Sequence, residues 1–195
     1  MTDPRVLRLF IAIELPSEVL SALTQLQHQL QRDSALARLR WVRPEGIHLT
    51  LKFLGETPAT QQPAIESALQ RAIQGVSPFQ LALGRLGSFG GKQSPRVLWL
   101  DLTGDTDPLV KLQRQVEAQL SPIGFPPETK RFSPHLTLAR IPQEDARIVA
   151  PALAAAIHPV PVPTATMPVR EISLMQSDLR PGGAVYTRLF DASLR

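Results

Sequence analysis

The sequence predicts one folding unit that mixes helices and strands in two similar halves. The chain has 195 residues, which is enough for one compact domain and too few for two independent ones. Strand-like and helix-like segments alternate along it, in an order that is roughly repeated. The segment His48-Leu49-Thr50-Leu51 also recurs unchanged as His135-Leu136-Thr137-Leu138, which indicates a duplicated unit.

The first half begins with a strand-like run at residues 7–13, which ends before a proline. Apolar residues at helical spacing predict a helix over residues 19–39. After a turn at 41–46, the alternating run 48–53 predicts the first motif strand, and residues 60–74 predict a second helix.

The second half repeats this order with one addition. Strand-like runs at 79–83 and 97–102 are joined by a glycine-rich stretch, 84–94, which we expect to be a mobile loop. Residues 107–120 carry an apolar stripe at helical spacing, and the proline-rich stretch 122–134 leads to the second motif.

The chain ends with the second motif strand, a helix and a hairpin. The motif strand is expected at 135–140 and an alanine-rich helix at 145–157. Two strand-like runs, 169–176 and 184–190, flank a turn at 178–183 and predict a hairpin or loop.

Composition narrows the possible functions. The chain has no cysteine, which excludes disulfides, thiolate nucleophiles and cysteine-based zinc sites and fits a reducing cytoplasm. The formal net charge of +4 favours an anionic partner without choosing among nucleic acid, nucleotide and phosphosugar. The N-terminus lacks the pattern of a signal peptide, and no stretch approaches the roughly 20 apolar residues of a membrane span, so we expect a cytoplasmic protein.

Strand alternation explains the spacing of the repeated motif. Side chains two residues apart point to the same face of a strand, so His48 and Thr50 share one face, as do His135 and Thr137. The leucines between them, with Phe53, point to the opposite face and into a core. Each strand thus presents an imidazole and a hydroxyl about 7 Å apart, and two such strands facing each other would line a groove.

This groove has the groups that phosphodiester cleavage needs without a metal or cofactor. One imidazole can remove a proton from water or a hydroxyl while the other protonates the leaving oxygen. Histidine suits both roles because its usual pKa of about 6.5 lets both protonation states exist near neutral pH. The hydroxyls of Thr50 and Thr137 can stabilise charge on the phosphate oxygens in the transition state.

Other interpretations of these residues remain open. The motifs could be surface strands of a duplicated sheet, or the histidines could bind zinc, although no acidic residue stands at motif spacing to complete a metal site. His28 and His158 do not repeat and are assigned no role. Lys52 shares the alternation of His48 and could add charge at the groove edge, whereas Arg140 has the alternation of the core leucines.

The motifs and their surroundings resemble the 2H phosphoesterase superfamily, specifically the RNA 2′,3′-cyclic phosphodiesterases, also called the 2′-5′ RNA ligase family. The resemblance covers nearly the whole chain, 1–195. The segments that carry it are 8–13, 41–47, 53–56, 132–140 and the final strand pair with Gly182 and Tyr186.

The resemblance implies an α+β, bilobal, duplicated fold in which two antiparallel sheets face a central cleft, with helices outside. It implies hydrolysis of an RNA-terminal 2′,3′-cyclic phosphate to a 2′-phosphomonoester, with His48 as proton donor and His135 as proton acceptor. It also assigns phosphate binding to Thr50, Thr137 and Arg140.

The expected partners are RNA ends or nucleotides that bear a 2′,3′-cyclic phosphate, bound by a monomer with no cofactor and no metal. Two alternatives remain beside hydrolysis: reversible 2′-5′ ligation of tRNA halves, and noncatalytic binding of RNA ends. Four aromatic residues could stack on a base or lie in the core: Phe10, Trp41, Phe53 and Phe132.

Overall fold

The computed structural model describes residues 5–157, 160–181 and 183–195. The expectations for His158 and Gly182 therefore fall outside the described residues. Within these ranges the chain forms four α-helices and nine strands of one antiparallel sheet. The predicted α+β class is confirmed.

Eight of the nine strands of the sheet form two half-sheets of four strands each, and the remaining short strand pairs with one of these half-sheets. The strands are β1 (Val6–Glu14), β2 (Arg40–Trp41), β3 (His48–Pro58), β4 (Phe79–Gly91), β5 (Ser94–Gly104), β6 (His135–Arg140), β7 (Thr166–Val169), β8 (Glu171–Arg180) and β9 (Gly183–Ser193). Their order is β7-β4-β5-β6-β3-β1-β8-β9, with β2 paired to β6. The motif strands β3 and β6 are the inner strands of the two halves and meet at the middle of this curled sheet.

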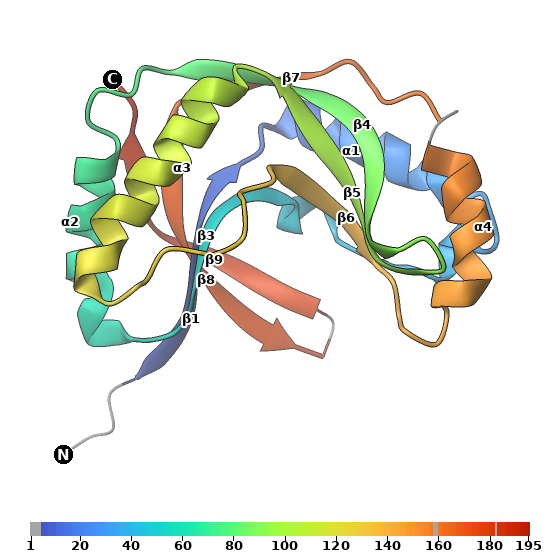
Figure 1. Cartoon of the computed structure of the whole chain (residues 1–195), viewed down its shortest axis with the longest axis horizontal. Coiled ribbons are helices and arrows are strands. Elements are labelled where there is room, and N and C mark those ends of the chain that lie inside the picture. The colour runs from blue at the N-terminus through green and yellow to red at the C-terminus, as the bar shows by residue number, and fades with distance from the viewer. Residues whose placement is uncertain (1–4, 158–159, 182) are drawn as a thin grey trace.

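Helices cover the outer face of each half-sheet. They are α1 (Ser17–Leu30), α2 (Gln62–Ala72), α3 (Thr106–Leu120) and α4 (Ala146–Ile157). Figure 1 shows α2 and α3 beside the half-sheet of β1 and β3, and α1 and α4 beside that of β4, β5 and β6. Most buried apolar residues form one continuous core, in which the leucines of both motifs, such as Leu49 and Leu136, are fully buried.

Several predicted boundaries were wrong. The first helix ends at Leu30 rather than residue 39, and a short 3-10 turn follows at Leu36–Arg38. The glycine-rich stretch 84–94 is not a long loop, because β4 runs to Gly91 and β5 starts at Ser94. The short strand β7 was not predicted. The predicted helices over 60–74, 107–120 and 145–157 are confirmed with small changes at their ends.

Candidate active site

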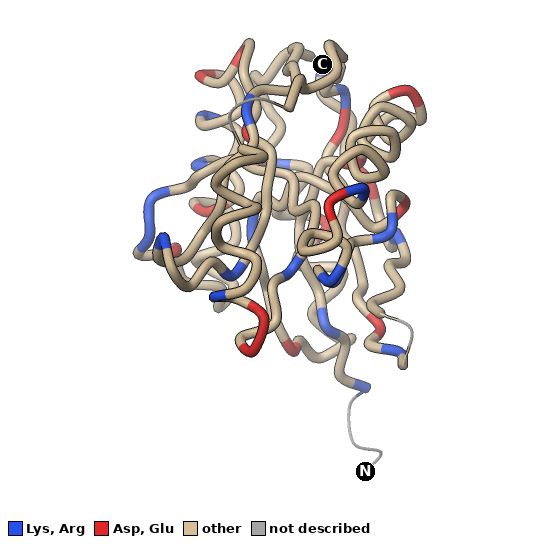
Figure 2. The backbone as a smooth tube through the Cα atoms, turned by 90° about the vertical axis from the view of Figure 1, so that its right-hand side faces the viewer, with Lys and Arg blue, Asp and Glu red and all other residues tan. Residues whose placement is uncertain are grey.

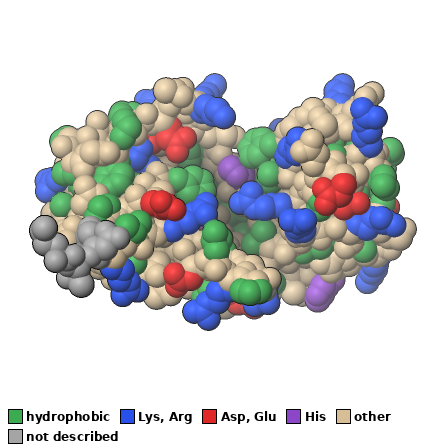
Figure 3. All heavy atoms as spheres, turned by 90° about the horizontal axis from the view of Figure 1, so that it is seen from below, with side chains coloured by type: hydrophobic (Ala, Val, Ile, Leu, Met, Phe, Trp, Pro, Cys, Tyr) green, Lys and Arg blue, Asp and Glu red, His purple; other side chains and the backbone are tan. Residues whose placement is uncertain are grey.

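The two motif strands meet at one backbone pair, Leu49 with Leu136. In this antiparallel register His48 comes opposite Thr137, and Thr50 comes opposite His135. The two His-x-Thr faces therefore belong to one concave surface, as the sequence predicted. Figure 3 shows a hollow between the two lobes on the underside of the molecule, with a histidine side chain in it and Lys or Arg side chains along its edge.

Both histidines are oriented in the same way by a backbone carbonyl two residues earlier. Nδ1 of His48 lies 2.9 Å from the oxygen of Gly46, and Nδ1 of His135 lies 2.8 Å from the oxygen of Ser133. A carbonyl oxygen only accepts, so Nδ1 carries the proton in each case. Nε2 of each neutral ring is therefore free to exchange a proton with a ligand.

Aromatic rings surround His48 and remove it from water. Phe10 and Tyr186 lie with their ring centroids 4.7 and 5.0 Å from that of His48. The pKa of His48 is lowered from 6.5 to about 4, mainly by burial and also by the nearby charges of His135 and Arg140, while the hydrogen bond to the carbonyl oxygen of Gly46 acts to raise it. His48 is therefore neutral at pH 7 in this environment.

His135 has an aromatic neighbour of its own. The ring of Phe89 lies 4.8 Å from it, centroid to centroid, in an edge-on arrangement, and Trp99 lies further away at 6.4 Å. The sequence pattern does not single out Phe89 or Trp99, because it predicts a loop around Phe89 and a strand-like apolar run around Trp99. The second motif therefore also has an aromatic wall on its cleft side.

A β-bulge in each motif strand reverses the alternation after the fourth motif residue. In β6 the pairing with β5 steps from Thr137 to Ala139, so that Leu138 is the extra residue. Gln27 of α1 donates its side-chain amide to the carbonyl oxygen of Leu138 at 3.1 Å. Arg140 consequently lies on the face of His135 and Thr137, not on the core face, and is exposed. Strand alternation alone predicted that Arg140 lies on the core face. The bulge explains why it lies on the cleft face instead.

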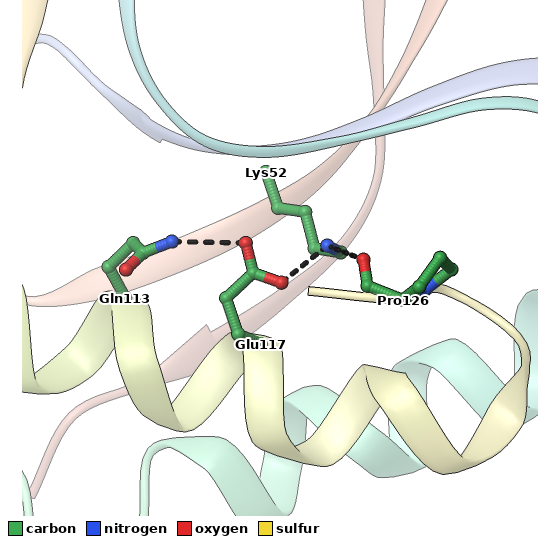
Figure 4. Close-up of polar contacts among 4 residues, drawn as sticks. All are labelled: Lys52, Gln113, Glu117 and Pro126. Atoms are coloured by element: carbon green, nitrogen blue, oxygen red, sulfur yellow. Dashed lines mark hydrogen bonds and ion pairs between the residues drawn. The ribbon is translucent and has the colours of Figure 1, made fainter. Parts of the chain in front are cut away.

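The equivalent bulge in β3 has Leu51 as its extra residue, 87 residues before Leu138. It corrects two expectations. Phe53, expected in the core, is 61% exposed on the cleft side. Lys52, which the alternation placed on the groove face, is instead buried and forms an ion pair with Glu117 of α3, while its Nζ donates to the carbonyl oxygen of Pro126 at 2.8 Å (Figure 4).

The other aromatic candidates divide between the core and its edges. Phe10 is buried, but in a small separate cluster on the cleft side with Met175, against which Tyr186 packs. Trp41 and Phe132 pack partly buried against the main core, and Nε1 of Trp41 donates to the carbonyl oxygen of Leu36. Of the four residues named from the sequence, Phe10 therefore lies next to His48, and Phe53 lies 6.3 Å from Phe10, centroid to centroid.

An acidic residue lies opposite each motif histidine on the neighbouring strand. Glu14 pairs with His48 and Asp101 pairs with His135 across their strands. The two acids are themselves 87 residues apart, a signal in the sequence that could have identified them. Within the described part of the chain, no group of three or more His, Asp, Glu or Cys side chains is arranged to hold a metal ion.

Comparison with known proteins agrees with the internal repeat. A family described as LigT like phosphoesterase matches the chain twice, over residues 13–99 and 100–186, again 87 residues apart. The chain belongs to this family. The family and the enzyme class predicted from the sequence are thereby confirmed.

Relatives match over nearly the full length of the chain. A Thermotoga maritima protein named RNA 2′,3′-cyclic phosphodiesterase is 32% identical over 188 residues, covering 95% of this chain and 94% of its own. A Methanothermobacter thermautotrophicus protein of the same name is 31% identical over 180 residues, covering 92% and 95%. The crystal structure of Escherichia coli LigT complexed with 3′-AMP is 28% identical, with a TM-score of 0.75 and coverage of 97% of this chain and 99% of its own.

Two further observations concern the distribution of charged residues and the length and hydropathy of the helices. Lys and Arg positions are spread over the chain and are interspersed with Asp and Glu (Figure 2). In the described ranges, none of the helices is both long and apolar enough to cross a bilayer.

Proposed function

We propose that the protein hydrolyses a terminal 2′,3′-cyclic phosphate of RNA to a 2′-phosphomonoester, using two histidines and no metal. The observation that carries this proposal is the antiparallel pairing of Leu49 with Leu136, which brings two His-x-Thr faces into one cleft. The names of the relatives support the choice of substrate. Both motifs come from one chain, so the site needs no second subunit, and we propose a monomer.

The proposed reaction uses Nε2 of both rings. His135 takes a proton from water as the water oxygen attacks phosphorus, and His48 delivers a proton to the 3′ oxygen as its bond to phosphorus breaks. The products are a 3′-hydroxyl and a 2′-phosphomonoester, so the proton taken by one ring is balanced by the proton given by the other.

The donor role places a requirement on His48. A general acid must hold its proton before the leaving group departs, whereas the pKa of His48 is lowered to about 4, mainly by burial. A bound phosphate diester brings a negative charge next to the ring, and a nearby opposite charge raises the pKa of a histidine. The proposal therefore requires that substrate binding itself protonates His48.

Three further residues are proposed to bind the phosphate. The hydroxyls of Thr50 and Thr137 lie on the cleft face, each opposite the histidine of the other motif, and can donate to non-bridging oxygens. Arg140, turned to the same face by the bulge at Leu138, adds a charged donor. Donors fixed in this way stabilise the charge that develops in the transition state.

The test is an assay with an oligonucleotide that ends in a 2′,3′-cyclic phosphate, in the presence of EDTA. We expect a product whose terminal phosphate resists a phosphatase specific for 3′-phosphates. Unchanged substrate, with binding retained, would indicate a noncatalytic RNA-end binder instead. Adding an RNA with a 5′-hydroxyl to the same assay would reveal a joined product if the protein ligates.

A further inference from the structure

A hollow of about 340 Å³ lies on the second half-sheet. Its lining includes Trp99 and Asp101 of β5, the β4 residues 84–86, and three apolar residues at and after the end of α4. Asp101 is the cross-strand partner of His135, and Trp99 that of Thr137, so both side chains lie on the cleft face. The hollow therefore begins one strand, about 5 Å, outward from His135 and extends across β4. Its volume is within the range of about 300–1,000 Å³ of small-molecule sites.

Trp99 lies flat against its neighbouring strand because residue 87 is a glycine. A Cβ atom added at Gly87 would come within 2.4 Å of Cη2 and Cζ2 of Trp99 and within 2.8 Å of Cζ3. Three atoms of the six-membered ring are thus at nearly equal distances from the Cβ position of Gly87. The Trp99 ring therefore lies over Gly87. Trp99 is only partly buried, and the ring of Phe89 lies 5.1 Å from it, centroid to centroid. The exposed part of the indole can contact a planar ligand.

Asp101 occupies a similar position over Gly84, where β4 bulges. Its Oδ1 accepts the backbone N–H of Arg85, and a Cβ atom at Gly84 would collide with that oxygen. Within the described residues Asp101 forms no salt bridge. Its counterpart Glu14, by contrast, pairs with Arg188 at 2.8 Å and accepts a hydrogen bond from Ser173. The carboxylate of Asp101 can therefore accept further hydrogen bonds, whereas that of Glu14 is already engaged by Arg188 and Ser173.

We propose that this hollow binds the base of the terminal nucleotide and that Asp101 makes it favour guanine. The proposal rests on the proposed function, because the cyclic phosphate between the histidines places its base about one strand away. A carboxylate only accepts, and guanine presents two adjacent donors, N1–H and N2–H₂. Uracil presents a carbonyl oxygen on either side of its single N–H, and the carboxylate repels these two oxygens. Trp99 supplies the stacking surface for whichever base enters.

The experiment compares the four nucleoside 2′,3′-cyclic monophosphates as substrates. We expect kcat/KM for the guanosine compound to exceed that for the uridine compound about tenfold, the effect of one hydrogen bond to a charged group. Asp101→Asn replaces an acceptor by an amide of the same shape and should remove most of this preference. Trp99→Leu should raise KM for all four compounds, and the matched variant Glu14→Gln should leave the preference unchanged.

Two results would overturn the proposal. One is an equal kcat/KM for guanosine and uridine compounds in the unmodified protein. The other is an equal loss for all four compounds in Asp101→Asn, because Asp101 would then act through its neighbour His135 rather than on the base.

Failure of the proposed function can be recognised separately. If no cyclic compound is hydrolysed, binding of guanosine and uridine 2′-monophosphates is measured by the fluorescence of Trp99 in a Trp41→Phe background. Tighter binding of the guanosine compound would support the base site without the reaction. Equal binding would overturn it.

Discussion

Leu49 and Leu136 are backbone partners, and each directly follows a motif histidine. This single pair lies at the centre of a pseudo-twofold arrangement in which the histidine of one motif comes opposite the threonine of the other. In the proposed mechanism each half therefore contributes one proton-transfer group and one hydroxyl, and neither half has a complete set.

Replacing either motif histidine with alanine should reduce kcat/KM by about 10²–10⁴, because a positioned general acid or base contributes that much. Both rings are partly buried on the cleft side rather than packed in the main core, so the loss of stability should be small. Steady-state kinetics and urea unfolding measure the two effects. His28→Ala, an exposed position on α1, is the matched control and should retain full activity. Equal activity of His48→Ala and the control would remove His48 from the mechanism.

Arg140 provides the second prediction. Because the bulge at Leu138 turns Arg140 to the cleft, Arg140→Ala should lower kcat/KM by about 10²-fold, the typical cost of removing one transition-state donor. Arg140→Lys keeps the charge but not the paired donors and should recover part of the loss. Arg32, at an exposed position after α1, is the control. If Arg140→Ala and Arg32→Ala behave alike, Arg140 does not bind the phosphate.

The same bulges mark the limit of what the sequence could predict. The alternation correctly placed His48, Thr50, His135 and Thr137 on one face, because no irregularity interrupts the strands up to those residues. The alternation failed at Lys52, two residues after Thr50, because Leu51 is an extra residue that has no partner on β1. No residue type in the run identifies such an insertion, since a leucine fits either face. The bulge itself occurs at equivalent positions of the two motif strands, Leu51 and Leu138.

The glycine-rich stretch 84–94 was misread for a related reason. Glycines usually indicate loops, and three of the positions in this stretch are glycines that the sheet requires. Gly84 and Gly87 make room for Asp101 and Trp99 of the next strand, while Gly90 has a φ of +104° near the hairpin turn. Cross-strand contacts of this kind depend on the register of β4 with β5, which the sequence alone does not reveal.

The third prediction concerns the pH dependence of stability. The folded protein holds His48 with a pKa of about 4, below its ordinary value of 6.5, so the unfolded chain takes up a proton more readily. Stability contributed by neutral His48 is therefore present above pH 6.5 and is lost as the pH falls from 6.5 to 4. The loss at pH 4.5 should be at most roughly 2–3 kcal/mol.

Urea unfolding of the protein and of His48→Gln at pH 7 and pH 4.5 measures this difference. The variant has no ring to protonate, so it should lose less stability than the unmodified protein over the same interval. An NMR titration of the His48 ring with bound inorganic phosphate should show a higher pKa than in the free protein, as the donor role requires. A pKa that does not rise would favour His48 as the proton acceptor.

The buried pair of Lys52 and Glu117 provides the last prediction. The ion pair connects motif strand β3 to α3, and the bond from Lys52 to the carbonyl of Pro126 reaches the segment that leads into His135. Removing one partner of a buried pair leaves the other charge without compensation, so Lys52→Met should cost about 3–5 kcal/mol of unfolding free energy. The double variant Lys52→Met with Glu117→Leu should recover much of this loss, because it removes both charges. Lys111→Met, at an exposed position of α3, should change stability by less than about 0.5 kcal/mol. A double variant no more stable than Lys52→Met would show instead that the contact with Pro126 carries the stability, because that contact is missing from both.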